Sequence, residues 1–500
     1  MGNQQFPGVY VEEIPRMPVV TPAVTCLPLF IGYTAKVTDL SGRGLSSGER
    51  MPIASLAEFE RCFGQGPRET LRLMLDVHGQ IVTREGYSPF YLHACVQQYF
   101  ANGGGLCEIL SLGAFPDAPD EAAFSSAIGQ LPVSPSFTMV AMPDAVSLPA
   151  LPQLQQQLLA YCQQQTNCLA ILDIPYCNHT TLTTTVDDFR KQIGDRYLRY
   201  GAAFLPWLEV INPGMQSMAH LEIKYTPGVA NAWSQYHKAT KLQSSLLRKR
   251  LQESPGNIHR MIPPCGTIMG LFQANARNIG IWKTPTSAEI QGIRSLSVSI
   301  HDQQQETLNV DPQTGKSINA IRRFSGRGIR LWGGRTLAGN DSESRYITAT
   351  LTTGFIKASL EQYLSAHRFA PNDTNMWAAI RQSVETFLQT LWRNGALQGN
   401  KPEQAFFVRL GLDQTMTAAD VAAGRILIDV GFALARPAEF TILKLQHQLA
   451  TDQPLPVQSA DNVVFQVRKK KVRAQTSPIN VAINPILPTT ASKPRSLESS

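Results

Sequence analysis

The sequence lacks the long apolar segments that mark membrane and secreted proteins. No run of about 20 apolar residues occurs, so we expect no membrane-spanning helix and no direct membrane insertion. The opening residues, MGNQQFPGVYVEEIP, contain neither a basic segment followed by an apolar core nor a myristoylation motif. The sequence therefore predicts neither a secretory signal peptide nor a lipid anchor.

Cysteine and histidine are too sparsely placed to indicate a metal site. None of the eight cysteines forms a C-x-x-C pair, and the nine histidines show neither H-x-x-x-H nor H-E-x-x-H spacing. We expect the cysteines to be reduced and structural, with disulfides or a zinc site as the weaker alternative. The cysteines are Cys26, Cys62, Cys95, Cys107, Cys162, Cys168, Cys177 and Cys265.

Three glycine-rich stretches resemble catalytic or phosphate-binding motifs only superficially. Residues 44–48, GLSSG, match the letters of a nucleophile elbow but lie in polar sequence without the flanking strand and helix. Residues 102–105, NGGG, lie between a helical and a strand pattern, the reverse of the order in a phosphate-binding loop. The glycines of residues 326–335 have turn spacing instead. We therefore expect no catalytic residue, no cofactor-binding residue and no cofactor.

Charge is low and unevenly distributed. Charged residues make up 17% of the chain, and the net charge is +7. Residues 455–500 contain seven basic and two acidic residues, so the rest of the chain is nearly neutral. A nucleic-acid partner is not expected, because the short basic run at residues 468–473 is weak support for binding either nucleic acid or a membrane surface.

The first half of the chain has the pattern of an α/β domain. Continuous apolar runs at residues 137–141, 168–174 and 201–210 alternate with helical patterns at 151–165 and 186–193. Such strands are typical of a parallel sheet that helices cover on both faces. Further strands are expected at residues 24–32 and 106–112, and further helices at 55–63, 91–100 and 233–252.

The stretch from residue 318 to residue 443 is the most regular part of the sequence. A strand between glycine turns ends at Trp332, and two long helical patterns follow at residues 344–367 and 374–394. Short β-type runs at residues 405–408 and 426–430 precede a strand predicted from Phe440 to Leu445.

Both ends of the chain are expected to extend from the folded body. Residues 1–22 contain one β-type segment between prolines, which is either the first strand of its own domain or an arm that pairs with a neighbouring sheet. Residues 451–500 are basic and rich in proline and serine. They are either a solvated extension or a segment that orders only against another subunit.

Six motifs, in order, resemble the C-terminal core of contractile tail sheath proteins. That family includes myophage sheaths, R-type pyocin sheaths and the sheaths of phage-like extracellular injection particles. The opening PGVYVEEI is similar to the start of sheath proteins as well. The six motifs are IWKTP, SGRGIRLWGGRTL, RYITATL, FAPNDTNMWAAIRQSVETFLQTLWRNGALQG, EQAFFVRLGLDQTMT and AGRILIDVGFALARPAEF.

The resemblance implies a multi-domain protein of mixed α/β and α+β class, with a sheath-type C-terminal core, an inserted α/β domain and extended arms. We expect an N-terminal arm at residues 1–22 and an α/β sheath domain at 23–262, whose outer part spans about 90–260. The C-terminal core is expected at 263–450, followed by the extension at 451–500.

The resemblance also implies a structural function without enzymatic activity. Six subunits per ring would stack helically around an inner tube protein, in contact with paralogous sheath subunits and with baseplate and terminal cap proteins. Particles would assemble in the bacterial cytoplasm and then form part of a virion-like or extracellular particle. The alternatives are a specialised baseplate- or cap-proximal sheath variant and, less favoured, an α/β enzyme without a recognisable motif.

Two groups of residues are predicted to make contacts between subunits. The resemblance implies that strands of the two arms add to neighbouring sheets: Val9, Tyr10, Val11, Glu12, Glu13 and Ile14, and Phe440, Thr441, Ile442 and Leu443. A local basic cluster is the candidate for charged contacts with the tube or a neighbour, although it also fits an ordinary solvated face. Its members are Arg322, Arg323, Arg327, Arg330 and Arg335.

Overall fold

The computed structural model describes seven ranges of the chain, all within one compact unit. The predicted arm strand at residues 9–14 and the basic run at 468–473 lie outside the described residues. The described ranges are 19–76, 81–165, 167–211, 221–225, 237–238, 259–286 and 288–450.

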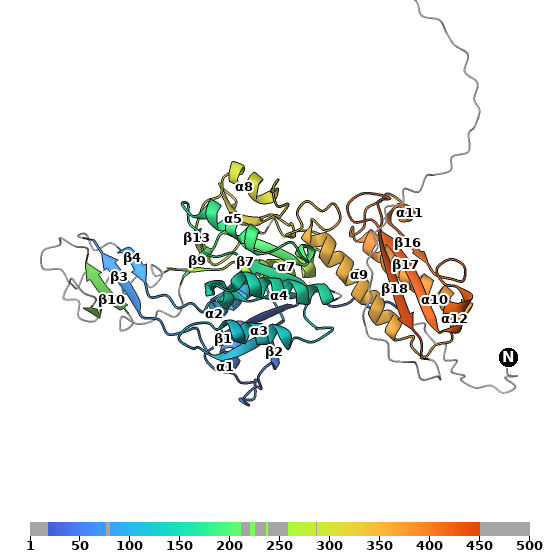
Figure 1. Ribbon diagram of the computed structural model, residues 1–500, viewed down its shortest axis with the longest axis horizontal. Coiled ribbons are helices and arrows are strands. Elements are labelled where there is room, and N and C mark those ends of the chain that lie inside the picture. Colours follow the sequence, from blue (N-terminus) through green and yellow to red (C-terminus); the bar gives the residue numbers. More distant parts are fainter. Residues whose placement is uncertain are drawn as a thin grey trace, which may run out of the picture. The chain divides into compact units, whose positions relative to one another are not determined.

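An eight-stranded sheet forms the centre of the α/β part (Figure 1). Its order is β15-β14-β8-β7-β6-β1-β5-β2, and the six inner strands are parallel. The predicted parallel sheet is thus confirmed. The strands are β1 (Pro28–Thr34), β2 (Arg50–Ile53), β5 (Cys107–Ala114), β6 (Met139–Ala141), β7 (Leu169–Asp173), β8 (Gly201–Leu205), β14 (Asn319–Phe324) and β15 (Gly328–Trp332).

The hairpin β14–β15 belongs to this sheet, although its sequence lies in the expected C-terminal core. Asn319 and Ala320 pair in parallel with Phe204 and Leu205 of β8. The division expected at residues 262 and 263 therefore passes through a single folded sheet.

Helices cover both faces of the eight-stranded sheet. Alternate residues of each inner strand face opposite sides, so each strand contributes apolar side chains to two core clusters. Phe30, Met139, Ile171 and Phe204 belong to the core cluster that includes residues of α2 (Leu92–Ala101) and α7 (Cys265–Asn278). Their strand neighbours Leu29, Val140, Leu172 and Leu205 belong to a second cluster. That cluster includes residues of α3 (Glu121–Gly129), α4 (Leu151–Gln164) and α5 (Leu182–Gln192).

Helices α2 and α7 pack so closely that glycine is required between them. A Cβ atom at Gly266 would lie 2.1 Å from the Cys95 carbonyl oxygen, and one at Gly270 would lie 2.5 Å from that of Tyr99. Both distances are too short for any side chain.

The strand predicted over residues 201–210 is wrong in its extent. It is divided into β8 and β9 (Leu208–Ile211), with Pro206 between them. Proline has no N–H group and cannot continue the hydrogen-bonded ladder. Strand β9 instead pairs antiparallel with β12 (His259–Ile262) and β13 (Ile293–Leu296) in a separate three-stranded sheet.

A four-stranded sheet with the order β11-β10-β3-β4 combines distant segments. Its strands are β3 (Leu71–Leu75), β4 (Ile81–Glu85), β10 (Leu221–Tyr225) and β11 (His237–Lys238). Strand β11 lies inside the helix predicted over residues 233–252, so that prediction is wrong for its two described residues, and the others lie outside the described ranges. Helix α1 (Leu56–Phe63) begins as predicted, because the Ser55 side chain accepts a hydrogen bond from Glu58 N.

The two long C-terminal helices are confirmed as α9 (Ile347–Ser365) and α10 (Thr374–Arg393). The Asp373 side chain accepts a hydrogen bond from Met376 N and so caps α10. Gly395, with a φ of 79°, follows the end of the helix. The predicted strands are β16 (Phe406–Arg409), β17 (Arg425–Phe432) and β18 (Thr441–Gln448).

The remaining described elements are short connections. Among the helices that the structure describes, none is long and apolar enough to cross a membrane. The connections are α8 (Asp302–Asn309), α11 (Pro402–Ala405), α12 (Ala418–Ala422) and the 3-10 helices η1 (Pro143–Ser147) and η2 (Leu198–Tyr200).

Candidate assembly surfaces

The C-terminal sheet has one face against helices and one face away from them. In its order β16-β17-β18, the central residue Val430 pairs with Val408 on one side and Leu443 on the other. Val430 and Leu443 are buried in the core cluster that also contains Ile380 of α10 and Leu360 of α9. The helical hairpin therefore supports this face, and the sheet register is determined by its apolar row.

The opposite face carries a row of alternating charges. Asp429 of β17 pairs with Arg409 of β16 and with Lys444 of β18, so one acidic residue lies between two basic residues. In the next row, the Phe407 ring lies against Gly431, where a Cβ atom would be 2.1 Å from the ring. Opposite charges on neighbouring strands favour this pairing over a register shifted by one residue.

Strand β18 forms one edge of this sheet among the described residues. Just beyond the strand, Leu449 N donates to Gly424 O, at the start of β17, whereas Ala450 N donates to Arg368 O, beyond the end of α9. Because N–H groups alternate in direction along a strand, every second N–H of β18 points away from β17. The residues with outward N–H groups are Ile442, Lys444, Gln446 and Gln448.

The structure places part of the predicted arm strands. Thr441, Ile442 and Leu443 lie in β18 and pair with β17 of the same chain, and Phe440 immediately precedes them. The Phe440 ring makes an edge-to-face contact with Phe407, at 5.0 Å between centroids. Residues 441–443 thus pair with β17 on one side and lie at a sheet edge on the other, as far as the described ranges extend.

Four of the five predicted contact arginines donate hydrogen bonds within the chain. Arg322 donates to Asp302 at 2.6 Å and to Ile300 O at 3.0 Å. Arg323 donates to Arg294 O at 2.7 Å. Their hydrogen-bonding capacity is therefore partly used by β13 and by the start of α8 with the residues before it.

The other arginines differ in exposure. Arg335 donates through Nη1 to Asn309 O and Gly339 O, both at 3.2 Å. Arg330 donates through Nε to Arg327 O at 2.8 Å, and the Arg327 side chain is exposed at the hairpin turn. Arg327, like Arg323, is therefore accessible at the surface, whereas Arg322, Arg330 and Arg335 are half-buried.

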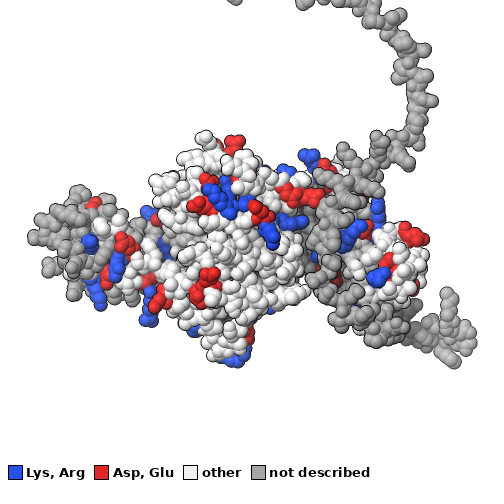
Figure 2. Space-filling view, in the orientation of Figure 1, with Lys and Arg blue, Asp and Glu red and all other residues white. Residues whose placement is uncertain are grey.

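The drawn face of the protein carries both signs of charge without a continuous field of one sign (Figure 2). Lysine and arginine side chains lie near aspartate and glutamate side chains, with wide uncharged areas between them. Such a surface matches the nearly neutral body that composition predicted.

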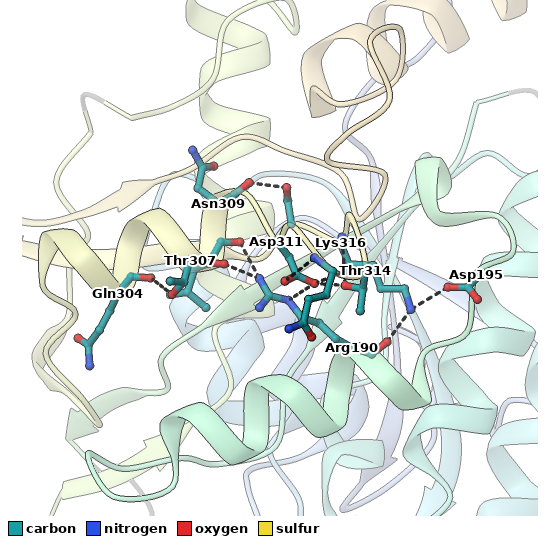
Figure 3. A network of polar contacts seen from close by, with 11 residues as sticks. Arg190, Asp195, Gln304, Thr307, Asn309, Asp311, Thr314 and Lys316 are labelled. Atoms are coloured by element: carbon teal, nitrogen blue, oxygen red, sulfur yellow. Dashed lines mark hydrogen bonds and ion pairs between the residues drawn. The ribbon is translucent and has the colours of Figure 1, made fainter.

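A buried ionic network joins α5 to the segment after α8 (Figure 3). Arg190 donates through Nη2 to Thr307 O at 2.8 Å, and its Nε lies 3.8 Å from Asp311 Oδ2. Lys316 donates through Nζ to Arg190 O at 2.6 Å and pairs with Asp195 at 2.9 Å. Arg190, Asp311 and Lys316 are all buried.

This network stabilises the position of the segment leading into β14. Burial lowers the pKa of Arg190, although Asp311 opposes that effect. Removing one charge from such a group leaves its partner buried and unpaired, which costs several kcal/mol. Residues 315–317, Gly-Lys-Ser, match the end of a phosphate-binding loop, but the Lys316 ammonium is engaged with Arg190 O and Asp195.

A second set of contacts links the chain before β1 to α9. Ala23 N donates to the Ser359 hydroxyl at 2.9 Å, and Asn167 donates to Val24 O at 3.4 Å. A Cβ atom at Gly354 of α9 would lie 2.6 Å from Asn167 Oδ1. The segment that follows the N-terminal arm is therefore held against α9 and the loop between α4 and β7.

The carboxyl ends of the parallel strands contain two fully buried aspartates. Asp144 accepts hydrogen bonds from Tyr33 N at 2.7 Å and from Leu92 N, at the start of α2, at 2.9 Å. Asp173 accepts one from Cys265 N, at the start of α7, at 3.0 Å. Burial raises the pKa of Asp144 to about 6 and that of Asp173 to about 7.

This edge is where open α/β sheets usually bind ligands. Here the helix N-termini, which favour anions, are occupied by the protein's own carboxyl groups. Among the described residues, no group of His, Cys, Asp and Glu side chains is placed to hold a metal ion. The positions of Asp144 and Asp173 therefore fit a structural capping role.

Sequence reasoning did not identify Arg190, Lys316, Asp144 or Asp173. Asp144 and Asp173 each lie at the end of an apolar stretch, which is the available signal, whereas Arg190 and Lys316 lie in polar sequence without one. Their partners lie far away in the sequence, for example 126 positions between Arg190 and Lys316. Only the tertiary structure brings these groups together.

Comparison with known proteins identifies the C-terminal module. Residues 340–448 match the family described as the phage tail sheath C-terminal domain. This range begins just before α9 and includes both helices and the three-stranded sheet. The resemblance expected from the sequence is confirmed by this match.

Two curated relatives have sheath names. The chain is 26% identical over 191 residues to a putative prophage major tail sheath protein of Pseudomonas aeruginosa (strain UCBPP-PA14), covering 37% of this chain and 46% of the relative. It is 27% identical over 197 residues to the tail sheath protein of Burkholderia phage BcepMu, covering 38% and 39%. The chain thus aligns with less than half the length of these relatives.

Solved structures match over most of the chain. A chain of the anti-feeding prophage baseplate in its contracted state has a TM-score of 0.61 and 25% identity, with 88% of this chain and 98% of that chain covered. A chain of the PVC sheath complex, an extracellular contractile injection system in its contracted state, has a TM-score of 0.58 and 22% identity. This match covers 89% of the present chain and 98% of the PVC chain. The mixed α/β fold is therefore shared with chains of contractile particles.

Proposed function

We propose that this chain is a structural subunit of a contractile tail sheath. Subunits would polymerise around an inner tube and contract to drive that tube through a target envelope. The observation that carries this proposal is the sheath-type C-terminal module at residues 340–448, within a fold that matches contractile-particle chains over most of its length. No particular feature of the described residues favours the alternative, a specialised sheath variant near the baseplate or the cap.

The subunits would be tied together by main-chain hydrogen bonds at open sheet edges. The outward N–H groups of β18 are one available edge, and the segment at residues 9–14 is the proposed added strand. Main-chain pairing survives the rotation of whole subunits when the connecting chain bends, and Pro15, Pro18 and Pro22 lie in the proposed connection. Six subunits per ring, stacked helically, would form the sheath.

The folded body would move as a rigid unit during contraction. The buried network of Arg190, Asp311 and Lys316 and the close packing of α2 on α7 support this proposal. No nucleotide is required, because contraction would release energy stored in subunit contacts during assembly. The role is therefore structural and non-enzymatic.

We propose a domain division that follows the sheet pairing. Residues 1–22 form the arm, and the α/β sheath domain includes the hairpin β14–β15. The C-terminal module proper extends from α9 to residue 450, and residues 451–500 form an extension. The outer part of the α/β domain is proposed within residues 90–260.

The proposed partners are further copies or paralogues of this subunit, an inner tube protein, and baseplate and cap proteins. Arg327 and Arg330 are the proposed charged contacts to the tube or a neighbour. Contacts of this kind break more readily than a large apolar interface, as contraction requires. Assembly would take place in the bacterial cytoplasm, followed by release as part of a virion-like or extracellular particle.

Electron microscopy of the purified protein tests the proposal, with and without the inner tube protein. We expect tubes or rings from the full-length protein, and their loss when residues 1–22 are deleted while the fold is retained. A variant with Arg327→Ala should still form polymers of the subunit alone. Small discrete particles from the full-length protein in the presence of the tube would contradict the sheath function.

A further inference from the structure

Two cysteines face each other at the connection between α4 and β7. Cys162 lies in the last turn of α4, and Cys168 immediately precedes β7. Their Sγ atoms are 3.5 Å apart, in contact but not bonded. A disulfide bond is about 2.05 Å long, so the two sulfur atoms need to approach by only about 1.5 Å.

We propose that Cys162 and Cys168 are a reversible disulfide-forming pair, which closes the loop between α4 and β7 when the protein meets an oxidising environment. The oxidant is a low-molecular-weight disulfide. The two thiols are not bonded to each other in the structure, and disulfides form and persist in oxidising environments. The relevance to an exported particle rests on the proposed function, but the chemistry of the pair does not.

Cys168 is the more accessible thiol and reacts first. It is 5% exposed, whereas Cys162 is fully buried, and burial raises the pKa of Cys162 well above its ordinary value. Cys168 loses its proton to solvent, attacks one sulfur of the small disulfide and expels one small thiolate. Cys162 loses its proton and attacks Cys168 Sγ, which forms the protein disulfide and expels the second thiolate.

The reaction balances without a further reagent. Two protein thiols are oxidised to one disulfide, and one small disulfide is reduced to two small thiols. The affected loop includes Asn167, which donates to Val24 O and lies against Gly354 of α9. The proposed bond would therefore restrain the loop that contacts both the chain before β1 and the C-terminal module.

The test counts free thiols after treating the full-length protein with oxidised glutathione at mildly alkaline pH. A second sample is refolded from denaturant in a glutathione redox buffer, so that burial of the thiols does not prevent the reaction. We expect the eight thiols to fall to six, with a mass loss of about 2 Da and a peptide linking Cys162 to Cys168. A dithiol reductant should restore all eight.

Two variants distinguish this pair from the other cysteines. Cys168→Ser should keep all seven of its remaining thiols in both samples. Cys177→Ser, which alters another buried cysteine of the same core cluster, should still lose two of seven. A Cys162–Cys168 linkage in either sample supports the proposal. Retention of all eight thiols in both samples, or a linkage between other cysteines, would overturn it.

Discussion

Cys265 N donates a 3.0 Å hydrogen bond to the carboxylate of Asp173, which joins the end of β7 to the start of α7. The carboxylate is fully buried, and it lies where the helix dipole favours negative charge. Burial nevertheless raises the pKa of Asp173 from 3.8 to about 7, so its proton is held more tightly in the folded protein than in the unfolded chain.

Asp173→Asn should reduce the loss of stability that accompanies rising pH. Because the folded pKa is raised, the contribution of Asp173 is present below pH 3.8 and lost as pH rises to about 7. We expect the free energy of unfolding of the unaltered protein to fall by about 2–4 kcal/mol across this window from Asp173. Denaturant unfolding at several pH values measures the slope, and an unchanged slope in the variant would refute this assignment.

Substitution of Arg190 should destabilise the α/β part more than substitution of its neighbour. Arg190→Met removes the hydrogen bonds to Thr307 O and Leu308 O and leaves Asp311 without its cation. We expect a loss of about 3 kcal/mol in the free energy of unfolding. Lys191→Met, at an exposed position of the same helix, is the matched control and should change it by less than about 0.5 kcal/mol. Equal effects would argue against a stabilising network.

Gly354→Ala should weaken the contact between α9 and the α4–β7 loop. Alanine favours a helix over glycine by about 1 kcal/mol, but the added Cβ would lie 2.6 Å from Asn167 Oδ1 and 3.2 Å from its Cα. The main chain of Asn167 must move, so we expect a net loss of about 1–2 kcal/mol. Thermal unfolding compares this variant with Gln362→Ala, at an exposed position of α9. A stabilised Gly354→Ala protein would show that the loop yields easily.

His447 should make the C-terminal module sensitive to acid. Burial lowers the pKa of His447 below 6.5, and the nearby positive groups His367 and Arg368 lower it further. Its contribution to stability is therefore present above pH 6.5 and is lost as pH falls through the lowered value. We expect His447→Leu to reduce this acid sensitivity, which hydrogen exchange of β18 amides at pH 5 and pH 7.5 measures. The same exchange rates in both proteins at both pH values would contradict the prediction.

Gln446→Pro should block assembly at the edge of β18 without unfolding the sheet. The N–H group of Gln446 points away from β17, so proline removes no hydrogen bond of the ladder within the chain. We expect tube formation to be lost or reduced at least tenfold, as measured by sedimentation and electron microscopy. Gln446→Ala should assemble normally. Normal tubes from the proline variant would show that this edge is not used.

The order of the elements and the type of sheet follow from the sequence. Continuous apolar strands separated by helical patterns predicted the parallel sheet, and the helices expected at residues 55–63 and 374–394 begin where the Ser55 and Asp373 side chains cap them. These features depend on local preferences and on the period of apolar residues, which act over a few positions. The ordered C-terminal motifs likewise predicted the module that now matches residues 340–448.

Only the tertiary structure decided which segments share a sheet and which charges meet. Strand β14 joins β8 across more than a hundred positions, and Lys316 reaches Arg190 across 126. The division at Pro206 also changed the expected topology, because the second half of the predicted strand pairs elsewhere. Local sequence determines the conformation of a segment, but its pairing depends on burial and hydrogen bonds with distant partners, which periodicity does not encode.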